Sequence, residues 1–170
     1  HQRRTFFKKR GASLDDAESW FSVTPEAVAK LTAETLLDGT TGGLITIDPF
    51  VGAGSNAIQQ AIADPTGIVI AIDIDPVKVA MAKKNAELYG VGSNIEFIVG
   101  DATQLLSSRT MRGANICLLS PPWGGIAPAP VGAASSSSSP AEPFRLSALE
   151  QPCDGMRLFE LADACAPCIA

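Results

Sequence analysis

Histidine is almost absent from this sequence of 170 residues, since the only copy is His1. Four cysteines are present, and Cys165 and Cys168 form a CxxC pair that has no second pair to match it. A tetrahedral zinc site needs four ligands drawn from such pairs or from histidines. The sequence therefore predicts no metal site, and we interpret both cysteines as ordinary thiols.

Long apolar runs are absent too. None approaches the roughly 20 residues that a helix needs to cross a bilayer. The basic start HQRRTFFKKR is not followed by the apolar region of a signal peptide. We therefore expect a soluble, intracellular protein. Because the sequence opens on His1 rather than methionine, we also expect it to be a piece of a longer chain.

Positive charge is scarce. The chain has 13 lysines and arginines against 18 aspartates and glutamates, a formal net charge of −5, which argues against a broad nucleic-acid-binding surface. Five of these thirteen basic residues nevertheless fall within residues 1–10. That cluster fits either a phosphate-contacting arm or a flexible, solvated tail, and composition favours the tail.

What the sequence does contain is a repeated alternation of short apolar strands with helices. The strands are apolar on both faces, which is typical of a parallel sheet covered by helices. Strands are predicted over 44–48, 67–73, 94–100 and 115–120, and helices over 22–37, 55–64, 75–90 and 154–165, with a helical turn near 103–108. The alternation predicts a doubly wound, mostly parallel α/β sheet that binds ligands at the carboxyl ends of its strands.

The first predicted helix has a clear beginning and end. Thr24 is the expected N-cap, Pro25 fits the first turn, and the glycine-rich residues 38–43 end the helix. We interpret residues 1–40 as a basic arm with a helical extension and residues 41–170 as the core domain. Residues 126–143 are of low complexity and are interpreted as a linker loop within that core.

The segment DPFVGAGSN (48–56) joins the end of a strand to the start of a helix. Asp48 closes the strand, and Gly52 and Gly54 allow a tight turn. A dinucleotide-binding loop would have a third glycine where Ala57 stands. The sequence also has no phosphate-cradling lysine motif, so a pyrophosphate ligand is disfavoured.

Two further strands end in acidic residues, Asp73 and Asp101. A carboxylate at the second strand end can accept both hydroxyls of a ribose, and one at the third can accept an adenine amino group. Each aspartate taken singly could instead be a turn or helix-cap residue. Three in succession favour a cofactor with a ribose, an adenine and a positive centre, and S-adenosylmethionine meets that description.

The segment SPPWGG (120–125) follows the fourth predicted strand. Pro121 and Pro122 carry no N–H, so the carbonyls and the Ser120 hydroxyl can accept hydrogen bonds from an amino group without competing donors. Trp123 offers a face on which a flat base can stack. The alternative is a proline-rich turn with a surface tryptophan, which is less favoured after a strand of a cofactor-binding sheet.

Four segments together resemble the trimethylguanosine synthase family, which methylates the exocyclic N2 of the 7-methylguanosine cap. They are WFSVTPE (20–26), DPFVGAGSN (48–56), AIDIDPVK (71–78) and SPPWGG (120–125). The resemblance implies the fold of class I S-adenosylmethionine-dependent methyltransferases. It also implies capped small nuclear and nucleolar RNA as substrate, 2,2,7-trimethylguanosine as product, and the nucleus, with the nucleolus or Cajal body as possible sites within it.

The resemblance also assigns roles to individual residues. It places Ser120 and Pro121 on the guanine amino group and Trp123 against the cap base, where a cation–π contribution is expected because that base is positively charged. The pocket for S-adenosylmethionine would be lined by Thr24, Asp48, Gly52, Gly54, Asp73 and Asp101.

The chain departs from the family pattern in three places. Ser13 stands where the family has a lysine, and a proline and a tyrosine are missing after residue 125. Strands carrying an arginine and an asparagine toward the cap phosphates are expected beyond residue 170, so we expect a C-terminally truncated chain. Alternatives are therefore a catalytically impaired cap- or cofactor-binding module, or a methyltransferase for another amino group on RNA or protein. We expect a monomer, although the sequence carries no information on oligomeric state.

Overall fold

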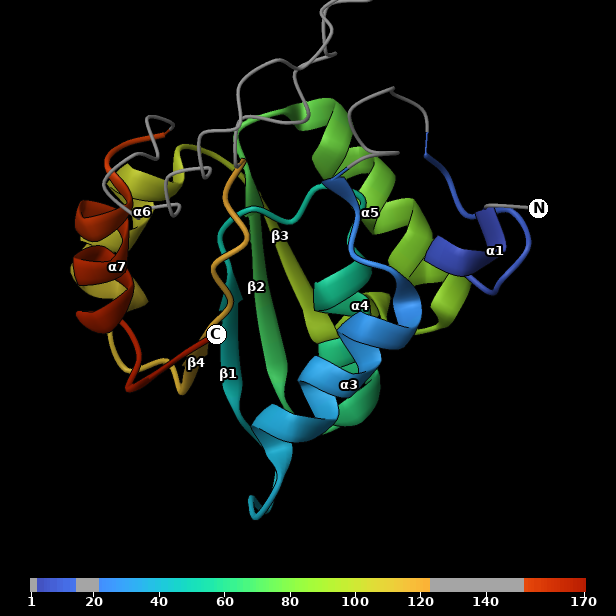
Figure 1. The fold of residues 1–170 in the computed structure, drawn as a ribbon, viewed down its shortest axis with the longest axis horizontal. Coiled ribbons are helices and arrows are strands. Elements are labelled where there is room, and N and C mark those ends of the chain that lie inside the picture. Colours follow the sequence, from blue (N-terminus) through green and yellow to red (C-terminus); the bar gives the residue numbers. More distant parts are fainter. Residues whose placement is uncertain (1–2, 15–21, 123–151) are drawn as a thin grey trace, which may run out of the picture.

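A parallel sheet in the order β3-β2-β1-β4-β5 forms the centre of the computed structural model, which describes residues 3–14, 22–122 and 152–170 (Figure 1). Its strands are β1 (Ile45–Asp48), β2 (Ile68–Asp73), β3 (Ile95–Val99), β4 (Ile116–Cys117) and β5 (Cys168–Ile169). This arrangement confirms the predicted fold class. The predicted linker 126–143 lies outside the described residues.

Helices cover both faces of the sheet, with α3, α4 and α5 on one side and α6 and α7 on the other (Figure 1). Their bounds are α1 (Arg3–Phe6), α3 (Glu26–Leu37), α4 (Ser55–Ala63), α5 (Pro76–Tyr89), α6 (Ala102–Ser107) and α7 (Gly155–Asp163), with short 3₁₀ turns at Gly92–Asn94 and Arg109–Met111. In the described part of the chain, no helix is both long and apolar enough to span a membrane.

The helix predicted from residue 22 begins later than expected, because its N-cap is Pro25 and not Thr24. The Pro25 carbonyl accepts the first helical hydrogen bonds, from Val28 and Ala29. The side chain of Thr24 makes no capping bond, and its carbonyl accepts the Ser55 hydroxyl instead. The prediction of Thr24 as N-cap was therefore wrong.

Alternation along the strands divides the core into two layers. In β2, Val69 and Ala71 face α4 and α5, whereas Ile70 and Ile72 belong to the layer under α6 and α7. Ile47, in the neighbouring β1, is completely buried in that second layer. Because successive strand residues point to opposite faces, strands buried on both sides must be apolar throughout, as the sequence showed.

The strand order creates a switch point beside β1. From β1 the chain passes through α4 to β2 and through α5 to β3, and α6 then brings it back past β1 to β4 on the other side. Right-handed crossovers in opposite directions place their helices on opposite faces. The carboxyl ends of β1 and β4 therefore flank the crevice in which such sheets bind ligands.

Apolar residues of the described N-terminal segment are packed, which corrects the prediction of a solvated tail at the start of the chain, although Lys8, Lys9 and Arg10 themselves are exposed. Phe7 and Leu14 are only 4% and 3% exposed and belong to the core cluster on the α4–α5 side. The Phe7 ring meets the Tyr89 ring edge-on at 6.2 Å between centroids. Composition suggested a tail because charged residues surround Phe7, but this apolar residue has a partner on α5.

A buried carboxylate joins this segment to the two helices beside it. Glu26 is 8% exposed, and its Oε2 accepts the backbone N–H of Lys8 over 2.6 Å and the hydroxyl of Tyr89. Burial, together with donation to Glu26, raises the pKa of Tyr89 to about 12. The phenol therefore stays protonated and keeps donating at physiological pH.

Asp64 organises the opposite, amino-terminal edge of the sheet. Its carboxylate accepts the backbone N–H groups of Gly43 and Leu44 over 2.9 and 2.8 Å and the Thr66 hydroxyl over 2.9 Å. Burial opposes ionisation of this carboxyl, but these hydrogen bonds outweigh it and hold its pKa below the ordinary value. The charged form is therefore the stabilising one.

We predict that Asp64→Asn lowers the free energy of unfolding at neutral pH by about 1–3 kcal/mol, because the amide must present a donor to one of the backbone N–H groups. A depressed pKa contributes stability that is lost as pH falls through the folded-state pKa, so the parent should weaken below about pH 4. Urea unfolding at several pH values should show that the free energy of unfolding falls less steeply with decreasing pH in the variant than in the parent. An identical acid loss in both proteins would contradict this role.

Candidate active site

The loop after β1 bends over the end of β2. The N–H of Val51 donates to the Ile72 carbonyl over 2.8 Å, and the N–H of Gly52 donates to Asp73 Oδ2 over 3.0 Å. Gly52 has φ +51, in the left-handed region where glycine is favoured. The loop and the second strand end thus form one hydrogen-bonded unit.

Gly54 is required for a different reason. It caps α4 at φ +91, and a Cβ at this position would lie 3.1 Å from the Cβ and 3.2 Å from the Cα of Ala82 on α5. The absence of a side chain therefore lets the start of α4 approach α5 closely. This contact fixes the height of the loop above the sheet.

Asp48 lies enclosed beneath the loop. It is 1% exposed, its Oδ1 accepts the Phe50 N–H over 3.3 Å, and its Oδ2 is buried without a hydrogen-bond partner. Burial raises the pKa of this carboxyl to about 7, and the nearby charge of Asp73 acts in the same direction, while the N–H groups of Phe50 and Ala57 oppose the shift. Asp48 supports the loop from below, whereas Asp73 lies at its rim.

Asp73 is half-buried at the end of β2. Its Oδ2 accepts Gly52, and its Oδ1 accepts the Asp75 N–H over 3.0 Å. A carboxylate offers about four acceptor positions, so two remain for further donors. This geometry fits a pair of vicinal hydroxyls at the strand end.

Asp101 follows β3 and caps α6. Its Oδ1 accepts the N–H and the hydroxyl of Thr103 over 2.8 and 2.6 Å, while its Oδ2 has only Gln104 Nε2 at 3.5 Å. The Thr103 hydroxyl holds the pKa of Asp101 below its ordinary value, against the effect of burial. Asp101 is therefore a helix cap, the alternative that the sequence analysis left open for each aspartate. Its Oδ2 remains available for another donor.

The segment after β4 continues between β1 and β5. The N–H of Leu118 donates to Ile47 over 2.8 Å, and that of Leu119 donates to Ala170 over 2.6 Å. Ser120 is half-buried and Pro121 is buried directly beyond this extension. Both therefore lie at the carboxyl end of the strand beside β1, at the switch point. Trp123 lies outside the described residues.

Thr24 reaches the same edge from the N-terminal side. It is half-buried, and its carbonyl accepts the Ser55 hydroxyl over 2.6 Å. Ser55 is 4% exposed and follows Gly54. Ser55 was missed by the sequence analysis, although a serine at a helix start is a recognisable signal for a polar contact.

Asn85 was missed as well. It is completely buried on α5 between apolar neighbours, and its amide bonds to Ser13 and to Ala53 of the loop between β1 and α4 (residues 49–54, here the glycine loop). The available signal was a polar residue on the apolar face of a predicted helix, beside Ala82 and Ala86.

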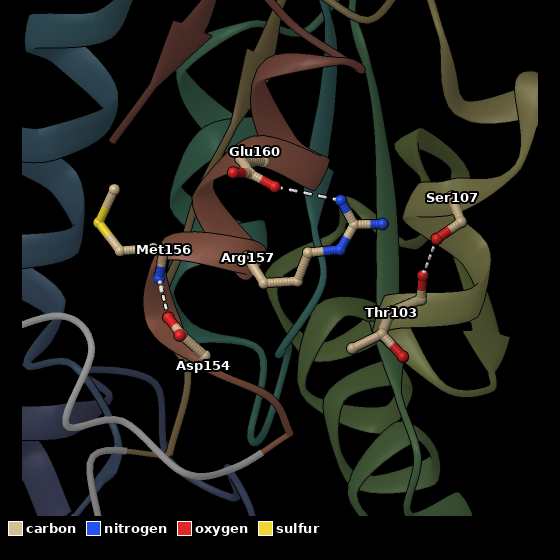
Figure 2. Close-up of polar contacts among 6 residues, drawn as sticks. All are labelled: Thr103, Ser107, Asp154, Met156, Arg157 and Glu160. Atoms are coloured by element: carbon tan, nitrogen blue, oxygen red, sulfur yellow. Dashed lines mark hydrogen bonds and ion pairs between the residues drawn. The ribbon is translucent and has the colours of Figure 1, made fainter.

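An open groove of about 540 Å³ between α6 and α7 has its polar groups paired within its own helices (Figure 2). Arg157 pairs with Glu160 at 3.1 Å, and the Ser107 hydroxyl donates to the Thr103 carbonyl over 2.6 Å. Asp154 accepts the Met156 N–H over 2.7 Å at the start of α7. These contacts account for the polarity of the groove, so the strand ends, and not this groove, form the candidate site.

The cysteines take no part in the site. All four are free, Cys117 and Cys165 are buried in the core, and the Cys165 thiol donates to the Leu106 carbonyl over 3.2 Å. The interpretation of Cys165 and Cys168 as ordinary thiols fits these contacts. Within the described residues, no group of three or more His, Cys, Asp or Glu side chains could hold a metal ion.

The residues around these strand ends match the model of a known protein family. The family model for RNA cap guanine-N2 methyltransferases matches residues 44–129, half of the chain. The chain belongs to this family. The match runs from β1 to the SPPW motif, so it covers the glycine loop, both further acidic strand ends and the segment after β4.

The chain is similar to two trimethylguanosine synthases from yeasts. The trimethylguanosine synthase of Schizosaccharomyces pombe is 45% identical over 113 residues, which is 65% of this chain and 46% of the relative. The enzyme of the same name from Saccharomyces cerevisiae is 34% identical over 128 residues, 74% of this chain and 40% of the relative. The chain thus spans less than half the length of each.

A solved structure shows the same fold at lower sequence similarity. The S-adenosylmethionine-dependent methyltransferase of Agrobacterium tumefaciens aligns with a TM-score of 0.51 and 23% identity, over 57% of this chain and 32% of that chain. This likeness confirms the expected class I methyltransferase fold.

We predict that Gly54→Ala destabilises the protein by about 1–3 kcal/mol. The new Cβ would have to occupy the left-handed conformation that Gly54 already has, and it would also collide with Ala82. Gly39→Ala is the matched control, since Gly39 has φ +73 but nothing within 4 Å of its added Cβ. Thermal unfolding should show the larger loss for Gly54→Ala. Equal losses would mean that the contact with α5 is not tight.

A second prediction concerns Asp48. Because its folded-state pKa is raised, the folded protein keeps a proton that the unfolded chain releases, and stability should fall as pH rises from about 4 to about 7. Asp48→Asn removes this fall and should stabilise the protein by about 2–4 kcal/mol at neutral pH. Urea unfolding at both ends of the window measures the difference. A variant with the same pH dependence as the parent would refute it.

Proposed function

We propose that this protein transfers a methyl group from S-adenosylmethionine to the exocyclic N2 of the 7-methylguanosine cap of small nuclear or nucleolar RNA, giving 2,2,7-trimethylguanosine. Family membership supports the reaction class and the cap substrate. The choice of RNAs, the number of methyl groups and a nuclear location follow from the resemblance. The structural observation that supports the proposal is the pairing of β1 with β4, because the chain leads from β1 into the glycine loop and from β4 to Ser120 and Pro121 at the same edge of the sheet.

The described residues fit the cofactor at several points. Asp73 would accept the ribose hydroxyls through its remaining acceptor positions, and Asp101 Oδ2 would accept the adenine amino group. Asp48 has one buried oxygen without a partner beneath the loop, so a positively charged ligand bound above the loop would favour ionisation of this carboxyl. Bound S-adenosylmethionine would supply the methyl group from a sulfonium centre.

The residues after β4 would prepare the acceptor. The lone pair of an exocyclic amino group is delocalised into the base, which makes the nitrogen a weak nucleophile. The Ser120 hydroxyl and the Pro121 carbonyl would accept hydrogen bonds from the amino N–H groups, which localises the lone pair on nitrogen and orients it toward the methyl donor; the proton displaced when the N–CH₃ bond forms would leave to solvent. No backbone N–H of Pro121 or Pro122 competes for these acceptors. Trp123 would hold the base by stacking, strengthened by the charge of a 7-methylated guanine.

This mode of recognition is consistent with an acidic protein. A net charge of −5 disfavours extended binding to phosphates, whereas stacking and hydrogen bonding to one end group need no basic surface. The protein would therefore select RNA by its cap more than by its body.

The direct test is incubation of the full-length protein with labelled S-adenosylmethionine and 7-methylguanosine-capped RNA, followed by mass spectrometry of the released cap. We expect label on N2. Label on another amino group would support the alternative acceptor, and cap binding in calorimetry without any transfer would identify a binding module. Either result would overturn the proposed reaction.

Paired variants divide the site. Trp123→Ala should abolish turnover, at least about 100-fold, while the affinity for S-adenosylhomocysteine changes less than about threefold. Asp73→Asn should weaken that affinity by about tenfold, because one oxygen becomes a donor facing the hydroxyls. Steady-state kinetics and calorimetry measure both. Equal losses of turnover and cofactor affinity in Trp123→Ala would contradict this division.

A further inference from the structure

We propose that Asn85 is a positioning residue that couples cofactor binding to docking of the N-terminal segment, residues 5–14. The inference deepens the proposed function and rests on it, since it concerns the same loop. The Asn85 side chain hydrogen-bonds to two segments that lie far apart in the sequence, at Ser13 before α3 and at Ala53 after β1.

The amide of Asn85 recognises the main chain of Ser13 at two points. Asn85 Oδ1 accepts the Ser13 N–H over 2.7 Å, and Asn85 Nδ2 donates to the Ser13 carbonyl over 3.0 Å. Both residues are buried, with Asn85 at 0% and Ser13 at 6% exposure. These bonds depend on the backbone of Ser13 and not on the identity of its side chain.

The second hydrogen of the same amide reaches the glycine loop. Asn85 Nδ2 also donates to the Ala53 carbonyl over 2.9 Å. This carbonyl belongs to the peptide that joins Ala53 to Gly54, whose N–H donates to Val51 over 2.8 Å. The peptide plane is thus held at both of its polar ends. Asn85 donates twice through Nδ2 and accepts once through Oδ1, so neither polar atom of this buried side chain lacks a partner.

Geometry connects this peptide to the cofactor site. Ala53 lies between Gly52, which donates to Asp73, and Gly54, which packs against Ala82. Loss of the hydrogen bond to Ala53 would free the Ala53–Gly54 peptide to rotate, which would make the loop between these two contacts less defined. Asn85 therefore helps to set the loop in the conformation that leaves Asp73 available at its rim.

A second hydrogen bond also joins the chain before α3 to the glycine loop. Ser55, immediately after Gly54, donates its hydroxyl to Thr24 over 2.6 Å. The chain before α3 is thus attached to the glycine loop at two places, through Asn85 and through Ser55. By linkage, a ligand that favours the ordered loop must favour docking of residues 5–14, and docking must favour the ligand to the same degree.

The test uses the full chain, with S-adenosylhomocysteine as the probe. We expect Asn85→Ala to raise the dissociation constant about five- to tenfold, because the Ala53 carbonyl loses its partner and the loop becomes less defined. Ser13→Pro, which removes the N–H at the other end of the network, should raise it as well. It also serves as the second variant if Asn85→Ala does not fold.

Two controls separate positioning from general stability. Ser13→Ala keeps both backbone bonds and loses only the contact of its hydroxyl with Lys84, so its affinity should equal that of the parent. Asp64→Asn is destabilised at the opposite edge of the sheet, so it should melt earlier with unchanged affinity. If Asp64→Asn weakens binding as much as Asn85→Ala does, the effect is merely one of stability and the inference fails.

Hydrogen exchange supplies a readout that a purely structural role would not move. In the parent, S-adenosylhomocysteine should slow exchange both in residues 51–54 and in residues 5–14. In Asn85→Ala, protection should persist in the loop at saturating probe and disappear from residues 5–14. A parent that does not bind the probe would refute the cofactor assignment itself. A parent that binds, with equal affinity and equal protection in Asn85→Ala, would overturn only the coupling.

Discussion

Parallel pairing of β1 with β2 on one side and β4 on the other is the constraint on which the rest of the structure depends. It places Asp48 opposite Ala71, two residues before the end of β2, and beside the extension of β4 that leads to Ser120. Strands that end at one edge must deliver their loops to one crevice. A glycine loop, an acidic strand end and a donor-free proline turn, distant in sequence, are thereby placed around a common space.

Within that frame the carboxylates have different tasks. Asp73 at the rim holds Gly52 and keeps acceptor capacity, Asp101 caps α6 with one oxygen, and Asp48 is enclosed with a pKa near 7. Burial explains the difference, because a carboxyl without water or full hydrogen bonding resists ionisation. Three aspartates that look equivalent in sequence thus differ in the structure: Asp73 lies at the rim of the loop with acceptor positions left, Asp101 caps a helix, and Asp48 is buried beneath the loop.

The N-terminal segment shows how a charged stretch can become part of a core. Phe7 and Leu14 pack against α5, and the Glu26 carboxylate satisfies the Lys8 backbone and the Tyr89 hydroxyl. Lys9 lies over the Tyr89 ring at 5.2 Å, and Lys8, Lys9 and Arg10 are exposed, so the charges stay at the surface while the apolar Phe7 and Leu14 are buried. The cofactor loop is consequently enclosed on its α5 side by residues that composition alone had assigned to solvent.

The sequence by itself determined the doubly wound class, the alternation of helices and strands from residue 26 to residue 117 and the acidic strand ends, because periodicity and glycine spacing are local properties, but it did not predict α1 or the short strand β5. It could not decide the burial of Asp48, the packing of residues 5–14 or the three bonds of Asn85. Each of these depends on a partner 32 or more residues away or on the protein around it. Only the tertiary structure brings such groups together, because the free energy of a buried polar group is set by what surrounds it and not by its neighbours in the chain.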